Sequence, residues 1–180
     1  MTYVISDIHG NMRRFDSVME QINLQPEDTL YILGDVIDRH PDGIRILRRI
    51  MNKPNIKMLL GNHEYMMLRA IGRPFDAYEK MDALLIEDQL ELWYQNGGYV
   101  THKHWKRLRK DLREEIIQYL HSLPLIFDKQ SVHFLVSIKR SADSAKHHVF
   151  MITQQHFDIG FLHDPAQDTD AIRMAINHIA

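Results

Sequence analysis

The chain has 180 residues, the length of one domain, and can bury a hydrophobic core without disulfides. Its 44% hydrophobic and 26% charged residues are typical of a soluble globular protein and exclude a globally disordered or fibrous chain. Lys and Arg total 22 and Asp and Glu total 24, so the basic excess of a nucleic-acid-binding domain is absent and we expect no nucleic-acid partner. The absence of cysteine excludes disulfides, thiol nucleophiles and thiolate metal sites.

The first 70 residues alternate between short apolar runs and segments with helical spacing. The runs 3–5, 29–33 and 56–60 are predicted strands. Each is followed by a predicted helix, over 11–23, from 42 or 43 to about 51, and from 62 to about 70. A β-α-β-α-β order predicts an α/β fold with a parallel sheet and right-handed crossovers.

The rest of the chain is predicted to be mostly helical and then changes in character. Residues 76–122 have helical patterning, interrupted by Gly97-Gly98. Residues 132–136 are one more predicted strand, and beyond them only 171–179 show a short apolar periodicity. No window approaches 18 uninterrupted apolar residues and the N-terminus lacks the pattern of a signal peptide, so we expect a cytoplasmic protein without a membrane partner.

Polar clusters follow each of the first three predicted strands. They are Asp7-x-His9-Gly10, Gly34-Asp35-x-x-Asp38-Arg39 and Gly61-Asn62-His63-Glu64. Taken singly, these blocks are typical of a β-turn, a surface ion pair and a helix N-cap. Taken together, they place carboxylates, imidazoles and an amide at the carboxyl ends of parallel strands, where ligands bind in such sheets. This set of side chains suits Mn²⁺, Fe²⁺ or Zn²⁺.

These blocks resemble the GDxHG, GDxxDRG and GNHE blocks of the phosphoprotein phosphatase family of dinuclear, calcineurin-like metallophosphoesterases. Trp93-x-x-Asn96-Gly97-Gly98 also resembles a block of the bacterial branch, which includes serine/threonine phosphatases and symmetrical dinucleoside tetraphosphate hydrolases. The resemblance covers about residues 1–136. It implies a four-layer α/β/β/α sandwich, here incomplete at the C-terminus.

The resemblance also implies two divalent metal ions, most simply Mn²⁺, with Fe, Zn or Ni as alternatives. Asp7 and His9 would hold the first ion, Asp35 would bridge both, and Asn62 would bind the second. No nucleophilic side chain is then required, because two metals can activate a water molecule for in-line attack.

The remaining roles implied by the resemblance concern the substrate. Arg39 would grip the phosphate as a bidentate cation, and Asn96 would lie on the substrate side. His63 would be the general acid for the leaving alkoxide, oriented by Asp38. Glu64 is expected to support His63 or the helix start, without a catalytic role.

Three functions follow as alternatives. The first is a phosphatase that cleaves phosphomonoesters, of the phosphoserine or phosphothreonine type, by a metal-bound hydroxide. Its substrate would be a phosphorylated protein or a small phosphoester. The second is a symmetrical dinucleoside tetraphosphate hydrolase with the same site. The third is a non-catalytic remnant that keeps half of the metal site. The oligomeric state is left open.

Two departures separate this chain from the family pattern. His40 stands where the second block ends in Gly, so we expect local backbone strain there. The family also supplies two further His ligands, in a VHAG-like and a later GHT-like block. Here residues 133–136 continue as Ser137-Ile138-Lys139-Arg140, and no GHT follows.

We therefore divide the chain into a catalytic domain, residues 1–136, and a divergent tail, residues 137–180. The tail is either a natural ending with substitute ligands or the product of a frameshift or truncation, which the loss of Glu, Tyr and Trp after residue 120 favours. Under the second explanation, the first sheet would keep an exposed edge. The candidate substitute ligands are His147, His148, His156 and His163.

Overall fold

The computed structural model describes residues 1–74, 82–129, 132–135, 151–152 and 174–177. Strands and helices alternate at the start of the chain: β1 (Thr2–Ile5), α1 (Met12–Ile22), β2 (Thr29–Ile32), α2 (Gly43–Ile50), β3 (Ile56–Met58) and α3 (Asn62–Ala70). Three helices follow: α4 (Ala83–Gln95), α5 (Tyr99–Trp105) and α6 (Lys110–Ser122). The last elements are short strands: β4 (Ile126–Lys129), β5 (Val132–Leu135), β6 (Met151–Ile152) and β7 (Met174–Asn177).

The first sheet has the strand order β3-β2-β1-β7. β1 pairs with β2, and β2 with β3, in parallel, which confirms the predicted β-α-β-α-β arrangement. β7 pairs antiparallel with β1, so the edge of β1 is covered, contrary to the exposed edge expected for a non-native tail. A second sheet has the order β4-β5-β6, with antiparallel pairing. β4 had no counterpart in the sequence prediction.

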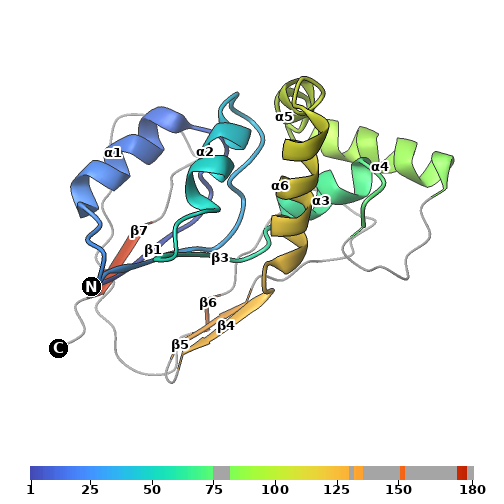
Figure 1. Ribbon diagram of the computed structural model, residues 1–180. Coiled ribbons are helices and arrows are strands. Elements are labelled where there is room, and N and C mark those ends of the chain that lie inside the picture. Colours follow the sequence, from blue (N-terminus) through green and yellow to red (C-terminus); the bar gives the residue numbers. More distant parts are fainter. Residues whose placement is uncertain (75–81, 130–131, 136–150, 153–173, 178–180) are drawn as a thin grey trace.

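Two groups of helices accompany the first sheet. Figure 1 shows α1 and α2 together on one side of it, and α3 to α6 gathered in a second group. α3 packs against α4, and α2 contacts α5. The break that separates α4 from α5 lies at Gly97-Gly98, as predicted, whereas residues 75–81 of the predicted helical stretch lie outside the described part.

The core lies between the first sheet and its helices. β2 contributes Leu30 and Ile32, which are both fully buried. α1 faces the core with Phe15, Val18 and Ile22, three positions on one face of a helix. The side chain of Asn11 caps the start of α1 by accepting a hydrogen bond from the Arg14 N–H at 3.1 Å.

The division of the chain at residue 136, and the two explanations for the tail of residues 137–180, stay predictions. Its described strands β6 and β7 pair with β5 and β1, so they join sheets that begin in the first 136 residues. Among the described residues, no helix is both long and apolar enough to cross a membrane.

Candidate active site

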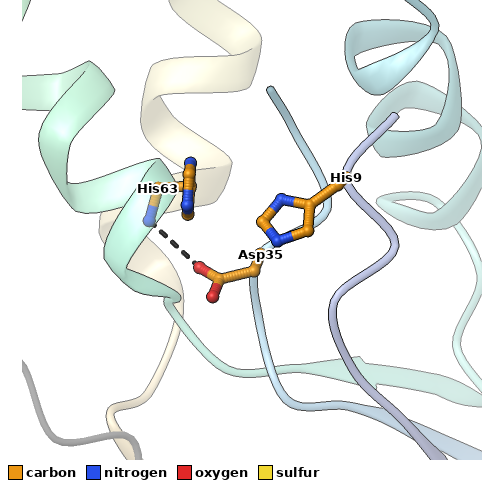
Figure 2. Close-up of side chains that lie close together, drawn as sticks. All are labelled: His9, Asp35 and His63. Carbon is orange, nitrogen blue, oxygen red and sulfur yellow. Dashed lines mark hydrogen bonds between the residues drawn. The ribbon is translucent and has the colours of Figure 1, made fainter. Parts of the chain in front are cut away.

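Three predicted site residues from three different strand ends meet in one buried cluster. His9 follows β1, Asp35 follows β2, and His63 lies in the first turn of α3, which follows β3 (Figure 2). Each offers one potential ligand atom, and these atoms lie within 4.8 Å of one another. The two imidazole rings meet edge to face, with centroids 4.6 Å apart. The parallel sheet therefore brings together side chains that are far apart in sequence, as its topology predicts.

Backbone hydrogen bonds hold these strand-end loops to one another. The His9 N–H donates to the Asp35 carbonyl oxygen at 2.9 Å, and the Gly10 N–H donates to the Val36 carbonyl oxygen at 2.7 Å. The His63 N–H donates to Asp35 Oδ1 at 3.0 Å, the bond drawn in Figure 2. One carboxylate oxygen of Asp35 is thus fixed by the start of α3, which orients the carboxylate within the cluster.

The loops hold several predicted site residues in the left-handed region of the backbone. Non-glycine residues with positive φ include Asp7 (54°), His9 (47°), Asp35 (55°), Asp38 (73°) and Arg39 (62°). The other such residue in the described part of the chain, Asn23, ends α1. This conformation costs a side-chain-bearing residue about 1–2 kcal/mol, and such strain concentrates at functional sites. The strain therefore marks the same loops as the sequence motifs.

Glu64 is a buried carboxylate that links two of these loops. It accepts hydrogen bonds from the N–H groups of Asp35, Val36, Ile37 and Gly61, at 2.9, 2.8, 3.2 and 3.1 Å. Burial, and then the Asp35 carboxylate, raise the pKa of Glu64 to about 7, while the N–H donors from Asp35, Ile37 and Val36 oppose the rise. Glu64 holds the loop after β2 against the start of α3, which extends its predicted supporting role.

His9 is oriented so that one ring nitrogen faces the cluster. Its Nδ1 donates to the Ile37 carbonyl oxygen at 3.2 Å. Its Nε2 is buried without a hydrogen-bond partner and lies 3.7 Å from Asp7 Oδ1. Burial works to raise the pKa of Asp7, but the neighbouring His9 and Ser6 side chains and the Arg39 charge hold that pKa below its ordinary value. Asp7 therefore favours the ionised form that a metal ligand needs.

His63 and Asp38 form a pair that is fully buried. His63 Nδ1 lies 2.8 Å from Asp38 Oδ2, so the proton on Nδ1 is donated to the carboxylate. The same oxygen accepts a hydrogen bond from the indole N–H of Trp93 at 2.7 Å. The Asp38 N–H donates to Thr101 Oγ1 at 2.9 Å. This arrangement fixes the orientation of the imidazole and the position of the proton on Nδ1.

Trp93 and Thr101 were not among the predicted site residues, although both touch Asp38. The Trp-x-x-Asn-Gly-Gly block was the signal that could have identified Trp93. It resembles a block of the bacterial branch, but no contact was predicted for the tryptophan from the sequence. Thr101 lies three residues after that block and carries no separate signal. Their contacts with Asp38 span 55 and 63 residues of sequence.

The remaining predicted site residues lie around the cluster. Arg39 is exposed, and its N–H donates to the Gly97 carbonyl oxygen at 3.1 Å. Asn62 is half-buried at the first position of α3. Asn96 is half-buried at the end of α4, where its Nδ2 donates to the Leu92 carbonyl oxygen at 2.8 Å.

His40 does not carry the strain that was expected of it. The residues with positive φ are its two predecessors, Asp38 and Arg39, and His40 itself is not among them. The prediction was wrong because the chain makes its left-handed turn before residue 40. The Nδ1 and the N–H of His40 instead lie 3.0 and 3.1 Å from the His9 carbonyl oxygen, which ties this residue to the loop after β1.

The residues present fit a divalent metal ion. Within the cluster, His9 and Asp35 offer an imidazole nitrogen and a carboxylate, which are ligand types for Zn, Fe and Mn, whereas His63 is bonded through Nδ1 to Asp38. The buried Nε2 of His9 lacks a hydrogen-bond partner, and its Nδ1 is held by a backbone carbonyl, the outer contact typical of a ligating histidine. The four tail histidines considered as substitute ligands lie outside the described residues.

The family model for calcineurin-like phosphoesterases matches residues 2–170. A symmetrical bis(5'-nucleosyl)-tetraphosphatase of Yersinia pestis is 38% identical over 151 residues, which are 71% of this chain and 52% of that protein. The protein with the same name in Erwinia tasmaniensis is 35% identical over 114 residues, which are 59% of this chain and 42% of that protein.

The chain spans about half the length of these curated relatives or less. Among solved structures, a metallophosphoesterase from Sphaerobacter thermophilus is similar with a TM-score of 0.45 and 22% sequence identity, over 73% of this chain and 44% of that one.

Proposed function

The chain belongs to the calcineurin-like phosphoesterase family, and from this premise we propose that it is a metal-dependent hydrolase of dinucleoside tetraphosphates. The buried cluster of His9, Asp35 and His63, backed by the His63–Asp38 pair, carries this proposal. The substrate class is supported by the names of the relatives, which are symmetrical bis(5'-nucleosyl)-tetraphosphatases. They favour this reaction over the phosphoserine or phosphothreonine cleavage that was the first sequence-based alternative.

The metal site is proposed to consist of four residues. Asp7, His9, Asp35 and Asn62 would hold two divalent ions. When bound, such ions activate water for attack on phosphorus and offset the phosphate charge. The unpartnered Nε2 of His9 and the lowered pKa of Asp7 support the part of this assignment that concerns the first ion.

The residues of the chain itself would bind the phosphate and move a proton. Arg39, exposed at the rim of the cluster, would bind a phosphate oxygen pair with its guanidinium, and Asn96 is proposed to contact the substrate. His63 holds its Nδ1 proton against Asp38, so Nε2 is the atom that would donate a proton to the leaving oxygen. The buried position of both side chains excludes water from the pair and strengthens their interaction.

A second candidate function is supported by the same buried pair. The leaving group of a phosphomonoester is a strongly basic alkoxide that needs a proton, whereas a nucleoside diphosphate is a much weaker base. An imidazole oriented by a carboxylate is therefore more valuable for monoester cleavage. A phosphorylated protein or small phosphomonoester accordingly remains a candidate substrate.

The test compares the two substrate classes on the same protein. The full chain is assayed with Mn²⁺ on diadenosine tetraphosphate and on an aryl phosphate, alongside Asp35→Asn and His63→Gln. The proposal expects faster cleavage of the tetraphosphate. Asp35→Asn should lower its rate by about 10²–10⁴-fold, and His63→Gln should lower it by less, because the nucleoside diphosphate leaving group needs less protonation. Equal rates for all three proteins would overturn it, and faster cleavage of the aryl phosphate would favour the second candidate.

A metal count separates either enzyme from a non-catalytic remnant. Two Mn²⁺ ions bound per chain, measured by elemental analysis after equilibrium dialysis, support a dinuclear hydrolase. One ion or none, together with no hydrolysis, supports the remnant. Asp35→Asn should lower the count, because Asp35 is the proposed bridging ligand.

A further inference from the structure

The α4–α5 segment, residues 93–101, comprises the end of α4, the break and the start of α5, and it contacts the Asp38–Arg39 turn at three points. The indole N–H of Trp93 donates to Asp38 Oδ2, and Thr101 Oγ1 accepts the hydrogen bond of the Asp38 N–H. The Gly97 carbonyl oxygen accepts the hydrogen bond of the Arg39 N–H. We call Trp93, Gly97 and Thr101 the Asp38 clamp. Trp93 lies in α4, Thr101 lies in α5 and Gly97 lies in the break between them. Each touches a residue that the proposed mechanism uses.

The two glycines of this segment permit the close approach. A Cβ added at Gly98 would lie 2.4 Å from Nε1 of Trp93, so any side chain at this position would push the indole. A Cβ at Gly97, where φ is +89°, would lie 3.0 Å from Cγ of Arg39. The Trp-x-x-Asn-Gly-Gly block therefore has a physical explanation. It brings an indole and a backbone carbonyl against the Asp38–Arg39 turn.

The clamp acts on a strained and buried part of the chain. Asp38 and Arg39 are consecutive non-glycine residues in the left-handed region, which is costly unless surrounding contacts hold it. The Asp38 carboxylate is fully buried, and Oδ1 has no hydrogen-bond partner. Its Oδ2 therefore receives both the Trp93 and the His63 hydrogen bonds. A hydrogen bond to an ionised group is stronger than one between neutral groups. Loss of the indole donor should therefore change the orientation of the Asp38 carboxylate, and with it the orientation of His63.

We propose that Trp93, supported by Thr101, is a positioning residue that orients His63 through Asp38, and thereby couples the α4–α5 segment to the proton donor. The coupling itself rests on hydrogen bonds present in the fold, while its effect on turnover also rests on the proposed function. A change in the position of α4 or α5 is thus transmitted to the imidazole. Along the chain, His63 and Trp93 are separated by about 30 residues, so the hydrogen bonds through Asp38 are the short connection between them.

The first test uses the full chain without metal, so it does not require turnover. The chain has two Trp residues, so two indole N–H signals are expected in a ¹H–¹⁵N spectrum, and Trp93→Phe identifies one of them. Asp38→Asn should shift the Trp93 signal and leave that of Trp105 in place. In Trp93→Phe, the ring ¹⁵N signals of His63, assigned by their loss in His63→Gln, should shift. Trp105→Phe, the same change at a buried position in α5, should leave them in place.

Two variants at Thr101 keep the proposal testable if Trp93→Phe does not fold. Thr101→Val removes the acceptor of the Asp38 N–H and should shift the His63 ring signals. Thr101→Ser keeps the hydroxyl and should restore the wild-type positions. His63 signals unmoved by both Trp93→Phe and Thr101→Val would overturn the positioning role.

The second test measures turnover and separates this inference from the proposed function. Trp93→Phe should lower kcat by about tenfold for a substrate with a basic leaving group, and less for one with an acidic leaving group, with a smaller effect on KM. In a His63→Gln background, Trp93→Phe should have no further effect, because it acts through that residue. An unchanged dependence on the leaving group, or full additivity with His63→Gln, would contradict the coupling. An inactive wild type would contradict the proposed function alone. The Trp93 and His63 signals of the first test would then decide whether Trp93 positions His63.

Discussion

The strand-end loops of residues 1–70 and the helices of residues 82–122 contribute to the same site in different ways. The loops after β1 and β2, together with the first turn of α3, supply every side chain of the proposed metal site and the proposed proton donor. The helices supply the groups that hold Asp38 and Arg39 in place. A strand-end loop can carry chemistry because the sheet fixes its position, whereas the orientation of one side chain in that loop depends on partners from elsewhere in the chain. The following predictions test this division of roles.

The largest effect is expected where both regions meet, at Asp38. Asp38→Asn should lower hydrolysis by about 10²-fold or more, because a neutral amide no longer stabilises the charged imidazole or fixes its Nδ1 proton. Asp42→Asn is the matched control. Asp42 bonds Arg45 at 2.7 Å in an exposed pair, so its loss should leave the rate unchanged. Equal effects of the two substitutions in a steady-state assay would contradict a role specific to Asp38.

A large loss of stability is expected in the core beneath the loops. Leu30→Ala in β2 should lower the free energy of unfolding by about 2–5 kcal/mol, since Leu30 is fully buried. Leu84→Ala makes the same chemical change in α4, where the side chain is 75% exposed, and should change stability by less than about 0.5 kcal/mol. Urea unfolding followed by circular dichroism measures both. Similar losses would show that α4 buries Leu84 in solution.

An intermediate effect is expected at Glu64, the carboxylate that joins two strand-end loops. Glu64→Gln should lower the free energy of unfolding by about 1–3 kcal/mol, because an amide offers one acceptor oxygen where the carboxylate uses two. Hydrogen exchange should also become faster at the Asp35 and Gly61 amides, which donate to Glu64. Unchanged exchange at both amides would contradict the linking role.

The smallest effect is expected at the exposed ion pair between Arg73 and Glu114. Arg73 Nη2 lies 2.8 Å from Glu114 Oε2, and both side chains are about half exposed. Glu114→Gln, the same substitution as at Glu64, should change the free energy of unfolding by about 0–1 kcal/mol, and less at high salt. A loss as large as that of Glu64→Gln would mean that this pair holds the helices more firmly than its exposure indicates.

Much of the first region could be predicted from its sequence. Apolar runs, helical spacing and polar residues after each strand are local signals, so β1 to β3 and the convergence of His9, Asp35 and His63 followed from topology alone. The left-handed turn at Asp38 and Arg39 could not be located in this way. Its position depends on contacts with Gly97 and Thr101, and the strain was predicted at the neighbouring His40 instead.

The second region shows the limit of local signals more clearly. The helices and their break at Gly97-Gly98 were predicted, but the hydrogen bond between Trp93 and Asp38 was not. Periodicity indicates which face of a helix is apolar, and a tryptophan on that face is predicted to be a core residue. It does not report that the polar edge of the indole meets a carboxylate across the site. Likewise, β7 pairs with β1 through a contact between segments nearly the whole chain apart.

That pairing of β7 with β1 has a consequence for synthesis of the protein. Until Met174–Asn177 leaves the ribosome, β1 can pair only with β2, so one edge of an apolar strand stays open. At about 5–20 residues per second, the interval between completion of β2 and arrival of β7 lasts several seconds or more. An unpaired strand edge is a template for intermolecular pairing. The nascent chain is therefore exposed to aggregation throughout the translation of residues 33–173, which include the helices that complete its site.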